Sequence, residues 1–193
     1  MNHTFILVLV GKNNMNKKIF FIILLILFIK TIQAEINIET ASEQEIKAAF
    51  IIKFTHFVKW PKKAFYSNKD EFIIAILGKH SFGNLFDPFI GKRIFGKRIS
   101  IVEISNIDKF EHAHILYIGP GEKNNFSKIF NKINNKNILT IGDTKGFAHM
   151  GCIINFIQKK ENIGFEINID AINKTNLKIS SELLRLARII QEK

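Results

Sequence analysis

The sequence predicts an α/β fold: a layered domain with a largely parallel sheet flanked by helices, followed by a C-terminal antiparallel ribbon plus helix. Short apolar runs that stop at a glycine, such as residues 72–78 and 114–119, are typical of strands buried on both faces. Segments with apolar residues at helical spacing lie between these runs, and this alternation favours a parallel sheet. The sequence shows no repeat and no proline-rich linker, so residues 35–193 are expected to form a single domain.

The first 34 residues have the order of a secretory signal peptide. Lys17 and Lys18 precede an apolar run over residues 19–29, and a short polar exit ends at Ala34. A membrane-spanning helix needs about 20 residues, roughly twice the length of this run. The pattern therefore predicts export to the periplasm and cleavage after Ala34.

Two features of this leader leave alternatives open. Ile32 lies three positions before the expected cut, where a small residue is more typical, so an uncleaved N-terminal anchor is the rival interpretation. Met15 would make a more usual start than Met1, which indicates that residues 1–14 belong to an over-extended gene start. In each case residues 1–34 carry targeting information and no fold.

The charge of the chain is strongly positive, with a formal net charge of +11 at pH 7. Such a charge could suit nucleic acid or an anionic membrane surface. The lysines, however, are scattered singly among asparagine and isoleucine, without the aromatic interleaving that single-strand binders use. Nucleic acid is therefore not an expected partner, and the charge indicates only a mildly basic surface.

The chain contains a single cysteine, Cys152, so an internal disulfide is excluded. Cys152 lies in residues 151–157, an apolar run typical of a buried strand. This context favours a role for Cys152 as a small apolar core residue over a redox or intermolecular role. Without a disulfide, the core must be stabilised by packing alone.

The first helix is predicted by a capping box, because Ser42 is followed three residues later by Glu45. Apolar residues at helical spacing then form one face: Ile46, Phe50, Phe54 and Phe57. The pair Trp60-Pro61 should end the helix, since proline disfavours helical geometry in the residue before it.

The remaining elements follow from the same patterns. Four strands are expected at residues 72–78, 99–104, 114–118 and 138–141. A turn or small hairpin is expected at residues 91–98, and helices at residues 82–89 and 125–133. The antiparallel ribbon is predicted from residues 152–158 and 163–169. The last helix is predicted over residues 180–191, with an apolar face formed by Leu183, Leu184, Ala187 and Ile190.

Two turns are candidates for a ligand crevice, because ligands of open α/β sheets bind beyond the carboxyl ends of the strands. Residues 119–122 and 142–144 both follow predicted strands. The predicted crevice is lined by Gly119, Glu122, Asp143 and Thr144. Both segments are also ordinary turn compositions, and neither contains a phosphate-loop or dinucleotide fingerprint, so no cofactor is expected.

Catalytic and metal-binding patterns are weak. His112 and His114 point to the same side of a strand, which is a spacing that can hold a metal, but only His149 or Glu111 could complete the ligand set. An ordinary polar pair at a strand edge is therefore expected instead of a metal site. No serine lies in a nucleophile elbow, and no carboxylates are paired for acid–base chemistry, so enzyme activity is not expected.

A polar network is predicted near the C-terminus. Glu166 and Asn168 share one face of a predicted strand, while Arg185 and Arg188 lie three residues apart on the predicted last helix and could meet Glu166. A network that attaches the helix to the sheet is favoured over a ligand site.

Several segments of the chain together resemble the YfiR-like family of exported regulators. The longer ones are residues 46–61, 142–148 and 165–188. Shorter matches fit between them in the right order: Gly78, Phe82, Gly83, Gly91 and residues 114–118. The resemblance spans about residues 42–190, and its order and spacing make it specific although each piece alone is weak.

This resemblance implies a periplasmic protein without a catalytic role. The best-known family member restrains YfiN, an inner-membrane diguanylate cyclase, and is sequestered by YfiB, an outer-membrane lipoprotein; family members also occur as homodimers. The expected function is negative regulation of cyclic-di-GMP signalling and biofilm formation, through the exported domain of a diguanylate cyclase or of a sensor kinase. The alternative is a periplasmic small-molecule sensor that binds its ligand beside Gly119 and Asp143.

The chain departs from the family pattern in one respect. Members with disulfides tend to have cysteines near the positions of Ala75 and Ala113, and both positions are alanine here. Redox control through that pair is therefore excluded for this protein.

Overall fold

The computed structural model describes residues 41–65, 70–133, 137–159 and 162–191. The predicted leader and its cleavage position at Ala34 lie outside these residues. The strands are β1 (Val58–Lys59), β2 (Glu71–Leu77), β3 (Arg93–Ile94), β4 (Lys97–Ile104), β5 (Ile115–Ile118), β6 (Leu139–Gly142), β7 (Ile154–Lys159), β8 (Asn162–Asn168), β9 (Lys178–Ile179) and β10 (Arg188–Ile190). The α-helices are α2 (Glu43–Phe57), α3 (Phe126–Ile133), α4 (Ile169–Asn173) and α5 (Ser181–Leu186), and four short 3₁₀ helices are η1 (Lys62–Phe65), η2 (Asp87–Phe89), η3 (Ile107–Lys109) and η4 (Pro120–Asn125).

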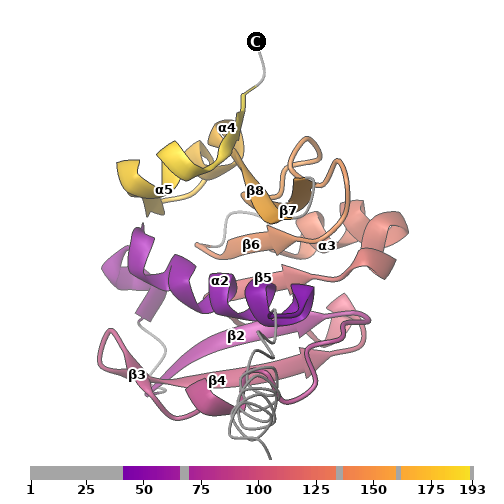
Figure 1. The fold of residues 1–193 in the computed structure, drawn as a ribbon. Coiled ribbons are helices and arrows are strands. Elements are labelled where there is room, and N and C mark those ends of the chain that lie inside the picture. The colour runs from indigo at the N-terminus through magenta and orange to yellow at the C-terminus, as the bar shows by residue number, and fades with distance from the viewer. Residues whose placement is uncertain (1–40, 66–69, 134–136, 160–161, 192–193) are drawn as a thin grey trace, which may run out of the picture. The chain divides into compact units, whose positions relative to one another are not determined.

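The main sheet has eight strands in the order β10-β8-β7-β6-β5-β2-β4-β3 (Figure 1). Its centre is parallel, from β4 through β2, β5 and β6 to β7. The β7–β8 ribbon and the β3–β4 hairpin are antiparallel, and β10 returns parallel to β8. The predicted α/β fold with a largely parallel sheet and a C-terminal ribbon is confirmed.

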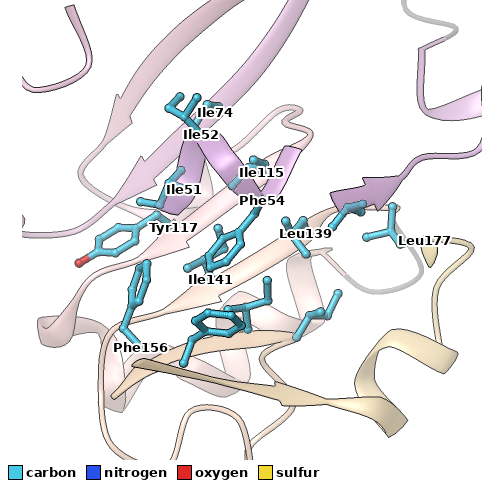
Figure 2. Close-up of a cluster of buried hydrophobic side chains, with 14 of the residues drawn as sticks. Ile51, Ile52, Phe54, Ile74, Ile115, Tyr117, Leu139, Ile141, Phe156 and Leu177 are labelled. Atoms are coloured by element: carbon cyan, nitrogen blue, oxygen red, sulfur yellow. The ribbon is translucent and has the colours of Figure 1, made fainter. Parts of the chain in front are cut away.

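Each face of the sheet has its own apolar core, because successive side chains of a strand point to opposite faces. In β2, Phe72, Ile74 and Ile76 pack toward α2, whereas Ile73, Ala75 and Leu77 pack toward α3. Burial on both faces explains why the strand is a continuous apolar run. Figure 2 shows Ile51 and Phe54 of α2 among the side chains of β5 and β6, Ile115, Tyr117 and Ile141.

Helix α2 begins with the predicted capping box. The Glu45 N–H donates to Ser42 Oγ at 3.2 Å, and the Ser42 N–H donates to Glu45 Oε2 at 2.6 Å. The helix ends at Phe57, three residues before Trp60, because Val58 takes extended backbone and pairs with Ile179 of β9. The proline at 61 is therefore not what ends it.

The prediction of a last helix over residues 180–191 is wrong beyond Leu186. Helix α5 ends there, Ala187 is extended, and β10 pairs with the outer edge of β8. Pairing satisfies backbone groups that β8 would otherwise expose, and this tertiary gain outweighs the local helical pattern.

The prediction of a helix over residues 82–89 is also wrong. The segment consists of turns followed by η2, since Gly83 takes a positive φ of 47° and Pro88 lacks a backbone donor. Phe82 and Phe86 are nevertheless buried in the α2-side core. Within the described residues, no helix has the length and apolar character needed to cross a membrane.

Candidate functional site

Asp143 is the centre of the candidate site, at the carboxyl edge of the parallel sheet. It directly follows β6, whose Gly142 lies beside Ile118 of β5. Tyr117 comes from the end of β5, and Lys47 from the first turns of α2, which covers this face. The loop that the sequence predicted as part of a crevice is therefore joined by two residues that no local pattern connects to it.

Lys47 and Tyr117 both bind the Asp143 carboxylate. Lys47 Nζ donates to Oδ1 at 2.6 Å and to Oδ2 at 2.8 Å, and the Tyr117 hydroxyl donates to Oδ2 at 2.7 Å. Glu43, one helical turn before Lys47, places Oε1 2.6 Å from the same Nζ. The Lys47 and Asp143 side chains are only 7% and 12% exposed, whereas that of Glu43 is 52% exposed.

This cluster fixes the protonation of its two donors. Burial alone would lower the pKa of Lys47, but the hydrogen bonds and charges of Asp143 and Glu43 outweigh it and raise the pKa. Burial raises the pKa of Tyr117, and the adjacent Asp143 charge raises it further. Lys47 therefore remains a cation and Tyr117 a neutral donor across the physiological range.

Gly142 lets the Asp143 loop pack closely against β7. A Cβ at this position would lie 2.8 Å from Asn155 Oδ1 and 2.8 Å from the Phe147 ring. Asn155 Oδ1 also accepts from the Thr144 N–H at 3.4 Å. The close approach of the Asp143 loop to β7 therefore requires glycine at position 142, and it keeps the loop beside the β7–β8 ribbon.

The other predicted crevice residues are packed against β2. The Gly119 N–H donates to Leu77 O at 2.9 Å, and a Cβ at Gly119 would lie 2.5 Å from Lys79 O. Glu122 contacts Gly78 and accepts from Asn125 Nδ2 at 2.9 Å. The two predicted turns do meet, because Thr144 Oγ1 donates to Pro120 O at 3.4 Å. Neither Gly119 nor Glu122, however, lines the hollow described next.

An open cleft of about 530 Å³ lies on the other side of Asp143, between α2 and the β7–β8 ribbon. We call it the Asp143 cleft. Its charged lining residues are Glu43, Lys47, Asp143, Lys145, Lys159 and Arg188. Its apolar lining residues are Phe156, Ile157 and Ile163. Lys47 is paired with Glu43 and Asp143, and Arg188 with Glu166, so Lys145 and Lys159 give the cleft a small positive excess beside its apolar wall.

The predicted C-terminal network forms in part. Glu166 is 1% exposed, forms an ion pair with Arg188 and accepts from Asn155 Nδ2 at 3.2 Å. Strand β10, not a helix, brings Arg188 to this position, because Arg188 lies beside Glu166 in the β10–β8 register. Through Asn155, the pair is connected to the Thr144 backbone at the rim of the Asp143 cleft.

The other two predicted network residues have separate positions. Asn168 caps α4, since its Oδ1 accepts from the Ala171 N–H at 2.7 Å and its Nδ2 donates to Ala148 O at 2.6 Å. Arg185 lies on the exposed side of α5, and the described structure gives it no contact with Glu166.

Of the two histidines, only His114 belongs to the core, whereas His112 is exposed. His112 and His114 have ring centroids 5.0 Å apart, but His114 is 1% exposed and stacks on Phe65 and Phe72. Its Nδ1 accepts from the Ile73 N–H at 3.0 Å. His149 and Glu111 are exposed, and no group of three metal-ligating side chains occurs in the described part of the chain.

Lys47, Tyr117 and Glu43 were missed from the sequence. Lys47 lies on the buried stripe of α2 with Ile51 and Phe54, and a lysine on such a stripe is a signal in itself, because lysine is almost never buried without a partner. Glu43 is visible as its partner at i−4. Tyr117 carries no signal beyond being the one hydroxyl in an apolar strand.

A family model described as YfiR/HmsC-like matches residues 44–188, which is most of the chain. This range includes Lys47, Tyr117, Asp143 and Arg188. No curated protein matches the sequence significantly.

Proposed function

Because the chain belongs to the YfiR/HmsC-like family, we propose that it represses a membrane diguanylate cyclase from the periplasm by protein–protein interaction. The family is periplasmic, and it is regulatory rather than catalytic. The match over residues 44–188 is the observation that carries this proposal.

The regulation we propose is allosteric. Binding of the exported domain of the cyclase, or of a sensor kinase, favours the inactive state of that partner. The regulator can shift the equilibrium between the active and inactive states of its partner only by the difference in its binding free energy for those two states. This difference is typically about 1–3 kcal/mol. An outer-membrane lipoprotein that competes for the regulator would relieve the repression.

The decisive experiment measures cyclic-di-GMP in a strain that lacks the gene. We expect a rise in cyclic-di-GMP and in biofilm formation, reversed by the full-length protein but not by a version without residues 1–34, which would remain in the cytoplasm. Unchanged cyclic-di-GMP, under conditions in which the protein is made, would contradict the proposal.

The Asp143 cleft supports a second candidate function, the sensing of a small molecule. Its volume of about 530 Å³ lies within the usual range for ligand pockets, about 300–1,000 Å³. Its excess of cations and its apolar wall suit an organic anion. A screen of carboxylates and inorganic phosphate by thermal shift tests this, with Lys145→Ala and Lys159→Ala expected to abolish any stabilisation. A ligand found in this way could itself gate the regulator, so the two functions are compatible.

A further inference from the structure

The β3–β4 hairpin carries a half-exposed phenylalanine at its tip. The turn between the two strands consists of Phe95 and Gly96, with positive φ values of 52° and 77°. Such turns favour asparagine or aspartate before the glycine, and a bulky side chain is uncommon at positive φ. The Phe95 ring lies 5.8 Å from the rings of Trp60 and Phe65, yet Phe95 remains 53% exposed. Packing therefore explains only part of the presence of a phenylalanine here.

The same hairpin places two arginines directly opposite each other. Arg93 and Arg98 are cross-strand partners, and a pair of like charges in this position destabilises a hairpin. Asp70 compensates in part, since its carboxylate lies 3.1 Å from Arg93 and 3.3 Å from Arg98. Both arginine side chains remain more than half exposed. Arg93 Nη1 also donates to Gly96 O, so its positive charge lies at the turn, beside Phe95.

The fold gathers further cations around this tip, although the sequence scatters its lysines. Helix η1 lies against the hairpin through the contact between Phe65 and Phe95, and it carries two exposed lysines. Two carboxylates lie beside the tip: Asp70, which pairs with both arginines, and Glu71, which is next to Arg98 in the β2–β4 register. A positive excess remains. We call this surface the hairpin patch; it consists of Lys62, Lys63, Phe65, Lys92, Arg93, Phe95, Lys97 and Arg98.

We propose that the hairpin patch docks on a membrane surface that contains anionic lipids. The cations contact the lipid headgroups, and Phe95 enters the layer in which headgroups meet acyl chains. Basic side chains near a membrane are attracted to anionic lipids, and exposed aromatic rings gain by entering the apolar side of the interface. A soluble polyanion would use the cations alone and would leave the exposed phenylalanine unexplained. The combination of charge and ring therefore favours a lipid surface.

The position of the patch leaves the Asp143 cleft accessible. The turn lies at the amino end of β4, and so at the amino ends of the parallel strands, whereas Asp143 follows the carboxyl end of β6. The hairpin is also at the edge of the sheet opposite to β10, whose Arg188 lines the cleft (Figure 1). A molecule docked by its hairpin turns the cleft away from the membrane. Docking is therefore compatible with partner binding and does not depend on the proposed function.

Vesicle binding tests the proposal with protein purified from the periplasm. The wild type should co-sediment with vesicles that contain phosphatidylglycerol and should not bind vesicles of phosphatidylcholine alone. Salt at about 0.5 M should release it, because screening weakens attraction between exposed charges. Any part of residues 1–34 that is retained is the same in every variant, so differences between variants report on the patch.

Phe95→Asn tests the ring, because asparagine before glycine suits the turn and the hairpin should still form. Vesicle binding should weaken by about tenfold through the loss of the inserted ring. Thermal unfolding confirms that the variant is folded. Phe95→Trp restores an aromatic ring and should bind at least as tightly as the wild type, since tryptophan is enriched at membrane interfaces.

Lys63→Gln combined with Lys92→Gln tests the charge. Each lost cation should weaken binding by about fivefold, and the two together by about 25-fold. The matched control is Lys109→Gln combined with Lys123→Gln, which removes the same charge from exposed positions beyond the carboxyl ends of β4 and β5. This control should change binding by less than about twofold.

Four results would overturn the proposal. They are a wild-type protein that does not bind phosphatidylglycerol vesicles, equal effects of the two double variants, and a folded Phe95→Asn variant that binds like the wild type. The fourth is binding to soluble polyphosphate as tight as binding to vesicles, which would identify the patch as a site for polyanions in general.

Discussion

Lys47 is a buried cation that is stabilised by two carboxylates, and its removal has a predictable cost. Lys47→Met would leave Asp143 with Tyr117 as its hydrogen-bond donor and without a cation. Loss of one partner of a buried ion pair costs about 3–5 kcal/mol, and we expect the lower end here because Asp143 remains 12% exposed. Urea unfolding measures the change in the free energy of unfolding.

Lys53→Met is the matched control for this prediction. Lys53 lies on the exposed side of the same helix, so its substitution should change stability by no more than about 0.5 kcal/mol. Equal effects of the two substitutions would contradict a structural role for the Lys47–Asp143 pair.

His114 makes the stability of the protein depend on pH. Burial, together with the charges of His112 and Lys97, lowers its pKa to about 4. The unfolded chain has the ordinary value of about 6.5, so between these two values it binds a proton that the folded state does not. Stability is therefore complete above pH 6.5 and falls as the pH decreases toward 4.

The expected loss through His114 reaches about 3 kcal/mol at and below pH 4. Carboxylates contribute to acid unfolding as well, so the measurement is the difference between the wild type and His114→Asn over pH 4 to 7.5. The variant should lose stability less steeply in this interval. Parallel pH profiles would show that folding does not lower the pKa of His114.

The candidate site could be predicted from the sequence only where its residues are local. Asp143 and Thr144 follow a recognisable strand. They could be identified because ligands of open α/β sheets bind beyond the carboxyl ends of the strands. Lys47 is 96 residues away from Asp143, and only the packing of α2 on the sheet brings the two together. The predicted apolar face of α2 is right in part: Phe54 is fully buried, and Ile46, Phe50 and Phe57 are only partly buried. The centre of the buried face also includes Lys47, Ala48 and Ile51, which the prediction missed.

At the scale of the elements, β10 illustrates how tertiary pairing overrides local pattern. Strong local signals predicted β2, β5, α3 and the β7–β8 ribbon, because each is a long apolar run or a clear helical stripe. Residues 188–190 also continue a helical stripe, yet they form a strand. The available edge of β8 is a property of the assembled sheet and is invisible in the sequence.

Arg188 is expected to stabilise this edge through its side chain as well as its backbone. Arg188→Ala should lower the free energy of unfolding by about 2 kcal/mol, because Glu166 would be left as a buried carboxylate bonded to Asn155. Arg185→Ala, an exposed position on α5, should change it by no more than about 0.5 kcal/mol. An Arg188 effect as small as that of Arg185 would show that Glu166 is satisfied without its cation.

At the scale of the whole molecule, two ion pairs with a buried partner lie near the Asp143 cleft. Lys47 joins α2 to the β6 loop there, and the Glu166–Arg188 pair joins the ribbon to the last strand. Asn155 connects the second group to the rim of the Asp143 cleft. A partner or ligand bound in this cleft would therefore contact α2 and Arg188 of β10 at once.

Export decides whether this domain can meet a periplasmic partner, and the leader predicts cleavage after Ala34. Mass spectrometry of the protein from the periplasm should give a mature N-terminus at Glu35. The residue before the cut must be small, so Ala34→Leu should leave an uncleaved precursor at the membrane, while Ala34→Ser should be processed normally. If the wild-type protein kept its N-terminus in the membrane, the leader would be an anchor, and regulation would then act from the membrane surface.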